Sequence, residues 1–521
     1  MTDSSAPADT ALSADLALST ARLKGAARLD PEERARLLAL ARSALGAAQA
    51  GRAVPLLAEL GRLDPADAET ALLHGVALRH GQHLAEAAQV FARARAAGAQ
   101  DPRLIEGLAQ TRYELGQPAA ALFGEALQAA PGNLDVLKNR AAALAAEGEV
   151  DTAEALLAAA LAANPGWIEG HKALATLHWT RGDPARFADS YAPAVQAQPA
   201  NADLWLAWFR ALAQVRDWKG AAVVLDQAER ALGTTPAVQV SRLFVASESG
   251  DTAAATRLLQ QTAAIEGETI SLCRVRHHLR HGRVAEAEAV CLRYLLTPSA
   301  SLFWPYLSLA WRVAQDPRHV WLDRPDQSIQ PREVELDAGE LAELAEVLRA
   351  LHVMERPYVE QSVRGGTQTD RSVILRHEPI IGRTRAAWLD AIRAYVDDLP
   401  PFEQGHPLLG CPRGELLIEG SWSVRLLRQG YNVPHNHPLG WLSTAFYVAL
   451  PDPGQLGPAP AGHIAFGTPP EELGLDLPPY CTIAPKVGRT AVFPSTMWHR
   501  TMPFDDGERL VIALDIRRPR H

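Results

Sequence analysis

The segment Pro434-His435-Asn436-His437-Pro438 stands just before the run Leu442–Leu450, which reads LSTAFYVAL. β-Branched and aromatic residues fill this run, and proline and glycine flank it, which predicts a β-strand. Comparable short runs occur at residues 416–418, 421–427, 463–466, 489–493 and 509–516. So many short strands within roughly one hundred residues indicate a sandwich or jelly roll.

The first half of the chain has a longer, helical period. Turn residues recur every 32 to 35 residues, at Gly81, Gly116, Gly148, Gly182, Asp217, Gly250 and Gly282. This spacing matches two-helix repeats of about 34 residues. Since one such unit cannot bury its apolar face alone, we expect the units to stack into an α-solenoid.

These patterns predict a multidomain α + β chain with four parts. Residues 1–19 are expected to be a disordered tail and residues 20–315 the helical repeats. A polar, proline-bearing linker covers residues 316–335, and residues 336–521 form the β-rich domain. Amphipathic patterns at residues 337–353 and 384–398 predict helices that flank the jelly roll.

Composition limits the possible partners and surroundings. The net charge of −9 argues against nucleic acid as the main partner, because phosphate binding needs a basic surface. The four cysteines form no close pair, so a reducing, cytoplasmic setting is expected. No apolar run reaches the roughly 18 residues of a membrane helix, and the first residues do not resemble a secretory signal. The oligomeric state is not predicted.

Three histidines and an arginine are the candidate site residues. On an extended chain His435 and His437 point the same way, and His499 ends another predicted strand. Three such ligands can hold one face of an iron ion and leave the opposite face open to a co-substrate and O₂. Arg509, ten residues after His499, carries a planar fork that suits a carboxylate.

Residues 357–518 resemble the 2-oxoglutarate/iron(II) oxygenases that often follow tetratricopeptide repeats in bacterial proteins. The resemblance rests on Gln361–Thr369, Pro434–Pro438, Phe446-Tyr447-Val448, Phe493-Pro494-Ser495 with His499, and Arg509. It implies a double-stranded β-helix that holds Fe(II) between His435/His437 and His499. It also implies that Arg509 pairs with 2-oxoglutarate and that O₂ is consumed. The period of the first half resembles the tetratricopeptide family itself.

Several alternatives remain open at this stage. The aspartate of the usual His-x-Asp is replaced by His437, so two or three histidines could bind iron. Tyr447 is a core residue or a donor to 2-oxoglutarate, and His463 is a surface residue or an accessory ligand. Arg425 and Arg428 are solvated positions or substrate contacts.

Three functions compete. The favoured one is a dioxygenase that hydroxylates an unknown substrate. The rivals are a repeat adaptor with a decayed oxygenase fold, and a three-histidine cupin-type dioxygenase that needs no 2-oxoglutarate. A protein or peptide is expected on the concave face of the repeats. Five tryptophans of the middle repeats are interpreted as core more often than as a ligand platform: Trp167, Trp179, Trp205, Trp208 and Trp218.

Overall fold

The computed structural model describes residues 5–47, 49–359 and 361–519. It divides into two compact units. The first comprises residues 1–162 with 375–378, and the second comprises residues 163–374 with 379–521. This division groups residues by how compactly they pack. The domain boundaries expected from the sequence remain a prediction. None of the described helices is long and apolar enough to cross a membrane.

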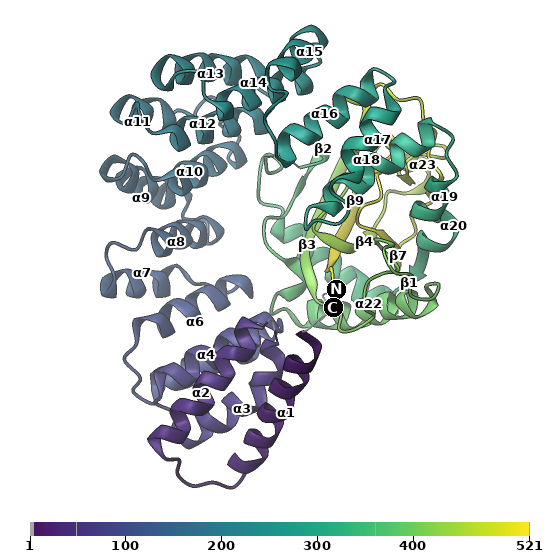
Figure 1. Cartoon of the computed structure of the whole chain (residues 1–521). Coiled ribbons are helices and arrows are strands. Elements are labelled where there is room, and N and C mark those ends of the chain that lie inside the picture. Colours follow the sequence, from purple (N-terminus) through teal and green to yellow (C-terminus); the bar gives the residue numbers. More distant parts are fainter. Residues whose placement is uncertain (1–4, 48, 360, 520–521) are drawn as a thin grey trace. The chain divides into compact units, whose positions relative to one another are not determined.

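The first unit is built of consecutive helices, seen as successive pairs in Figure 1. Side chains such as Asp67 and Asn133 cap helix starts by accepting backbone N–H groups, and Gly116 and Gly148 take the positive φ that the turns require. The predicted turns therefore lie where the period placed them. The helices are α1 Ser5–Leu23, α2 Pro31–Gly46, α3 Ala50–Leu63, α4 Ala68–His80, α5 Leu84–Ala96, α6 Pro102–Glu114, α7 Ala120–Ala129, α8 Leu134–Ala146 and α9 Val150–Ala163.

Helix α1 differs from the expected disordered tail of residues 1–19. Residues 5–19 belong to this helix, whereas residues 1–4 lie outside the described part of the chain. The physical reason is burial, because Leu16 and Leu23 pack into the apolar cluster that α2 and α3 form with Leu37, Leu56 and Leu57.

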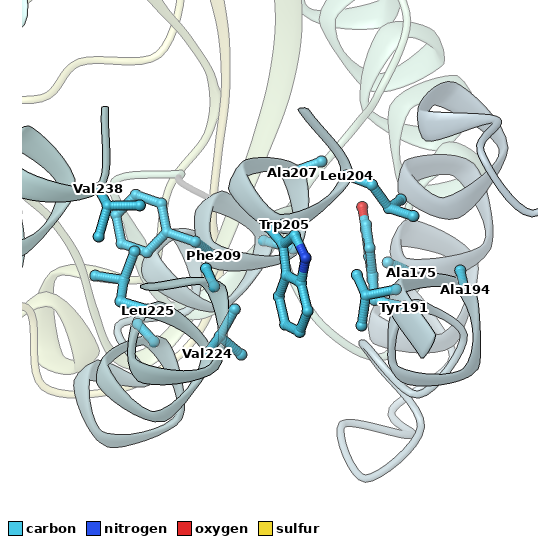
Figure 2. Packing of buried hydrophobic residues seen from close by; sticks show 14 of the residues in the cluster. Ala175, Tyr191, Ala194, Leu204, Trp205, Ala207, Phe209, Val224, Leu225 and Val238 are labelled. Atoms are coloured by element: carbon cyan, nitrogen blue, oxygen red, sulfur yellow. The ribbon is translucent and has the colours of Figure 1, made fainter. Parts of the chain in front are cut away.

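The second unit continues the helical pairs. Its core is an apolar cluster in which Trp205 lies among Tyr191, Phe209 and Val224 (Figure 2). Trp205 is therefore a core residue, as expected. The helices are α10 Ile168–Thr180, α11 Tyr191–Ala197, α12 Ala202–Gln214, α13 Trp218–Leu232, α14 Pro236–Ser249, α15 Thr252–Gln261, α16 Glu268–Arg280, α17 Val284–Leu292, α18 Ala300–Val313, α19 Arg318–Asp323 and α20 Pro325–Ser328.

An antiparallel β-sheet follows the repeats in the same unit. The strand order is β1-β7-β4-β9-β3-β8-β5-β6, and β2 pairs with β3 outside this path. The strands are β1 Gln330–Glu333, β2 Val363–Gln368, β3 Ile418–His435, β4 Gly440–Ala449, β5 Ile464–Phe466, β6 Cys481–Ile483, β7 Arg489–Pro494, β8 His499–Thr501 and β9 Arg509–Arg517. All the strands predicted from residue 421 onward have a counterpart among them.

The sheet curls into a nearly closed jelly roll. Phe466 on β5 and Phe493 on β7 lie far apart in strand order, yet their rings are 4.9 Å apart. The other face of the sheet is covered by helices α21 (Ala338–Leu351) and α22 (Pro379–Asp398). Trp388 of α22 packs on Phe446 and donates to Thr490 Oγ1 at 3.1 Å. The predicted fold class, an α-solenoid followed by a jelly roll with flanking helices, is confirmed.

The predicted linker, residues 316–335, has regular structure. It contains α19, α20 and β1, and β1 pairs antiparallel with β7 from Gln330 to Glu333. Its polar composition suits an edge strand, which has one side open to water. The segment is thus an integral part of the sheet.

The last repeats pack directly on the jelly roll within this unit. Leu473 and Trp498 share one apolar cluster with Trp304 and Leu307 of α18. The indole of Trp498 donates to Pro305 O at 3.0 Å. Figure 1 shows α16–α18 beside the strands. This contact explains why the last repeats and the sheet form one compact unit.

Candidate metal centre and cavity

A cavity of about 1180 Å³ opens inside the jelly roll and extends to the repeats of the same unit. On the sheet side, Val511 and Ala513 of β9 and Thr444 of β4 line it with small side chains. Because residues alternate along a strand, Arg509 and Asp515 lie on the same face of β9 as Val511 and Ala513. The cavity therefore has polar groups placed along an otherwise apolar wall.

His435 and His499 are neighbours across a strand pair. His435 ends β3, His499 begins β8, and the two residues are direct partners in the antiparallel register. Their ring centroids are 4.2 Å apart. The Nδ1 atom of His435 lies 2.7 Å from Val433 O, and that of His499 lies 3.0 Å from Met497 O.

His437 joins them from the turn that leads into β4. Its ring centroid is 5.1 Å from each of the other two, and the ligand nitrogens of all three lie within 4.8 Å of one another. Its Nδ1 is 2.8 Å from the carboxylate of Asp515, which also accepts a hydrogen bond from Ser443 at 2.6 Å. The structure thus brings together the three histidines that the sequence singled out.

The hydrogen bonds determine which nitrogen of each ring carries the proton. Carbonyl and carboxylate oxygens only accept, so Nδ1 donates in all three histidines and Nε2 keeps its lone pair. Burial, and to a smaller extent His437, lowers the pKa of His435 to about 3. Burial followed by His435 also lowers the pKa of His499 well below its ordinary value. These two rings are therefore neutral near pH 7, which is the form that binds metal.

Arg509 is a buried cation without an anion. Its side chain is 2% exposed, and its Nε has no hydrogen-bond partner among the residues that the structure describes. Its guanidinium lies 4.9 Å from the centroid of the Tyr447 ring, and the hydroxyl of Tyr447 is likewise unpaired in the described chain. A buried charge costs several kcal/mol unless it is paired, so this place suits an anionic ligand.

The donor set fits an iron(II) ion and a keto acid. Three neutral imidazoles converge at one end of the cavity, and imidazole is a suitable ligand for iron. Arg509 lines the same cavity and has an unpaired Nε, so it can donate to a carboxylate, and the unpaired hydroxyl of Tyr447 belongs to the ring beside its guanidinium.

Other candidates from the sequence lie elsewhere. The Nδ1 of His463 is 3.2 Å from Thr482 Oγ1, and this histidine is not part of the cluster. Arg425 is neutralised by Glu508, with its Nε 2.6 Å from the carboxylate. Arg428 is exposed on β3. None of these three residues lines the cavity.

The run Gln361–Thr369 forms one wall of the cavity. Gly365 has a φ of +68°, and a Cβ on Gly366 would lie 2.2 Å from Arg425 O, so the two glycines allow β2 to approach β3. A register shift between Arg364 and Gly366 marks the resulting bulge. The hydroxyl of Ser362 then reaches Nε2 of His435 at 3.3 Å.

Sequence reasoning missed Asp515, Ser362 and Arg364. Asp515 had a recognisable signal, because it lies six residues after Arg509 and strand alternation places both on one face. Ser362 and Arg364 carried no signal beyond their position in a distinctive run. Of the five tryptophans, Trp179 and Trp218 line the cavity, although a core role was the favoured interpretation for the group.

A jelly roll with a histidine cluster and a buried arginine at one cavity defines an oxygenase-type site. Residues 420–515 match the family model described as "Putative 2OG-Fe(II) oxygenase", and residues 119–177 match a tetratricopeptide repeat model. Two segments of the chain thus match models of the two kinds that the sequence predicted, a tetratricopeptide repeat and a 2-oxoglutarate/iron(II) oxygenase domain.

Solved structures with similar folds are of both kinds. A prolyl-4-hydroxylase from Pseudomonas putida is 18% identical, with 37% of this chain and 94% of that chain covered and a TM-score of 0.26. A tetratricopeptide repeat protein from Parabacteroides merdae is 16% identical, with 46% and 97% covered and a TM-score of 0.30. Yeast Tom70 is 15% identical, with 52% and 60% covered and a TM-score of 0.35. No curated protein matches the chain.

Proposed function

We propose that the C-terminal domain is an Fe(II)- and 2-oxoglutarate-dependent dioxygenase that hydroxylates a substrate bound in the cavity. The observation that carries this proposal is the pairing of two features in one cavity: three converging imidazoles whose Nδ1 atoms donate elsewhere, and a buried Arg509 with no acidic partner among the described residues. Bound together, Fe(II) and 2-oxoglutarate would activate O₂ for insertion into a C–H bond.

Each residue has a defined task in this proposal. Nε2 of His435, His437 and His499 would hold the metal, while the acceptors at Nδ1 fix the orientation of each ring. Arg509 would bind the far carboxylate of 2-oxoglutarate, and the hydroxyl of Tyr447 would donate a hydrogen bond to the same carboxylate. The apolar walls would exclude water from the reacting atoms.

The repeats, in this proposal, recruit the substrate. Every second helix from α10 to α18 contributes a side chain to the cavity, which suits a protein or peptide held by the repeats. The concave face of the repeats is where we place this partner.

An anaerobic titration tests the proposal. Adding 2-oxoglutarate to the Fe(II)-loaded protein should produce the charge-transfer absorption of an iron-bound keto acid. Arg509→Ala should weaken 2-oxoglutarate about 30- to 1000-fold, because it removes a charge-assisted bidentate contact of roughly 2–4 kcal/mol. Arg509→Lys should recover only part of this, since a point charge cannot reproduce the fork.

Two outcomes would favour the rivals. Turnover of O₂ without 2-oxoglutarate, together with unchanged keto acid binding in Arg509→Ala, would support a cupin-type dioxygenase. Absence of any Fe(II) binding would support a repeat adaptor with a decayed site.

A further inference from the structure

The cavity is much larger than the proposed co-substrate needs. Its volume of about 1180 Å³ exceeds the roughly 300–1000 Å³ of most small-molecule sites. One wall consists of strand residues around the histidines. The opposite wall comes mainly from the first helix of successive repeat pairs: Trp179 on α10, Gln214 on α12, Phe244 on α14, Arg276 on α16 and Tyr306 on α18. Trp218 of α13 adds to this wall. An occupant therefore reaches the histidines while it lies along the repeats.

The cavity lining has a net positive charge, whereas the whole chain has a net negative charge. The chain carries a net charge of −9, yet the charged residues that line the cavity are five arginines and one glutamate, a difference of four positive charges. Arg509 lies at the metal end, and Arg216, Arg276, Arg356 and Arg364 lie outside that end. A cavity lined by one sign of charge concentrates ligands of the opposite sign.

Two of these arginines are partly neutralised. Arg276 pairs with Glu248 at 2.7 Å, and Arg216 pairs with Glu472 at 2.9 Å. Both therefore contribute less to the attraction of an anion than their formal charge suggests.

The other two have no acidic partner among the described residues. Arg364 is half-buried on β2, and one of its terminal nitrogens donates to the carbonyl oxygens of Gln361 and Val363. Arg356 stacks over Trp179, with its guanidinium 5.1 Å from the ring centroid. Both line the cavity. Two cations that have no acidic partner among the described residues, one of them stacked on an indole, form a receptor for a carboxylate attached to an apolar body.

We propose that the cavity binds an extended peptide segment of a partner protein whose acidic side chain pairs with Arg364 and Arg356, next to the residue presented to the histidines. This inference rests on the proposed function. A peptide is favoured over a small anion for two reasons. The cavity runs past six helices of the repeats, and its arginine, tryptophan and tyrosine content is that of a protein-binding surface.

The role of Arg364 follows from its position. It lies two residues after Ser362, whose hydroxyl contacts His435, so a carboxylate held by Arg364 fixes the peptide next to the metal site. Arg364 is then a specificity-determining residue. The charge of Arg364 selects an acidic peptide segment. The short stretch of backbone between Ser362 and Arg364 sets the distance from that segment to the histidines.

The test uses the full chain and fluorescent peptide libraries of fixed length. All the libraries have the same randomised apolar positions. The positions that flank them carry glutamate in one library, glutamine in the second and lysine in the third. We expect the glutamate library to bind about tenfold more tightly than the glutamine library, and the lysine library not to bind. The glutamate advantage should shrink as NaCl rises from about 0.05 M to about 0.5 M.

Arg364→Gln should remove most of this advantage, reducing it to less than about threefold. Arg428→Gln is the matched control, because it removes the same charge from an exposed position of β3 outside the cavity. Equal binding of the glutamate and glutamine libraries, or an Arg364→Gln variant that keeps the preference, would overturn the proposal. Complete displacement of the peptide by glutarate, a free dicarboxylate, would reassign these arginines to a small anion and overturn the peptide assignment.

The same variants separate this inference from the proposed function. Their 2-oxoglutarate titration reports on Arg509 and the metal, and Arg364→Gln should leave it unchanged. Glutamate-selective peptide binding without any 2-oxoglutarate binding would reject the oxygenase proposal and keep the peptide site. The reverse result would keep the oxygenase and reject the acidic peptide.

Discussion

The environment of His437 sets this site apart at the scale of single residues. In the usual His-x-Asp arrangement a carboxylate would stand at this position and bind the metal directly. Here the imidazole occupies the position, and the carboxylate of Asp515 lies 2.8 Å behind it at Nδ1. The negative charge of a carboxylate is thus retained near the metal position, but it lies behind the His437 ring and does not touch the metal position directly.

We expect all three histidines to be ligands. His435→Ala, His437→Ala and His499→Ala should each weaken Fe(II) binding at least about tenfold, because each removes one of three protein ligands. Anaerobic competition with a colorimetric chelator measures this affinity. An unchanged affinity in His435→Ala or His437→Ala alone would identify a two-histidine site, and three unchanged affinities would move the metal elsewhere.

Asp515→Asn should weaken Fe(II) binding about 10- to 100-fold, the usual cost of altering a carboxylate behind a metal-binding histidine. The amide keeps the shape of the side chain but removes the charge that polarises His437. Asp452→Asn is the control, since Asp452 is exposed, makes no side-chain cap hydrogen bond and does not line the cavity. The same chelator competition reads both variants, and thermal melting shows whether they are folded. Equal affinities in the two variants would reduce Asp515 to a packing role.

At the scale of elements, β2 is the strand on which the shape of the cavity depends. Its bulge at Gly365 and Gly366 brings Ser362 and Arg364 to the cavity wall, and Thr369 continues the contact with β3 by accepting from Ser423 N at 3.0 Å. A side chain on Gly366 has no room, because its nearest neighbours are backbone atoms of β3.

Gly366→Ala should therefore lower the free energy of unfolding by roughly 1–3 kcal/mol, as overpacking does, and displace β2 from β3. Gly382→Ala is the matched control. It lies in helix α22, a Cβ there meets nothing within 4 Å, and alanine favours a helix interior by up to about 1 kcal/mol. Denaturant unfolding measures both. A Gly366→Ala variant as stable as the control would show that β2 can shift at little cost.

At the scale of the whole molecule, the jelly roll depends on the repeats that precede it. Leu473 and Trp498 are buried against α18, so a fragment that lacks this helix exposes an apolar surface. The compact unit that contains the cavity begins at residue 163.

We expect a fragment of residues 163–521 to unfold cooperatively and to bind Fe(II) and 2-oxoglutarate within about threefold of the full chain. A fragment of residues 336–521 should aggregate or melt much earlier, because each large apolar side chain that it exposes costs roughly 1.5–3 kcal/mol out of a small total stability. Calorimetry and the same titration test both fragments. A shorter fragment that folds and binds like the full chain would show that the repeats are dispensable for the site.

The sequence by itself determined the features that depend on a regular spacing of residues along the chain. The repeat spacing predicted the helical pairs, the short β-rich runs predicted the jelly roll, and the spacing of His435 and His437 predicted that their rings point to one place. These features are readable because a helix or strand imposes its own period on the residues that face the core.

Only the tertiary structure decided how distant segments meet. It placed Asp515 behind His437, gave the polar residues 330–333 a partner in β7, and buried Leu16 so that α1 forms. It also opened one cavity that both Arg509 and Trp179 line, and it placed Arg364 on the wall of that cavity. The physical reason is that such contacts join residues far apart in the chain, so no local pattern records them, and their free energy arises only when the segments pack together.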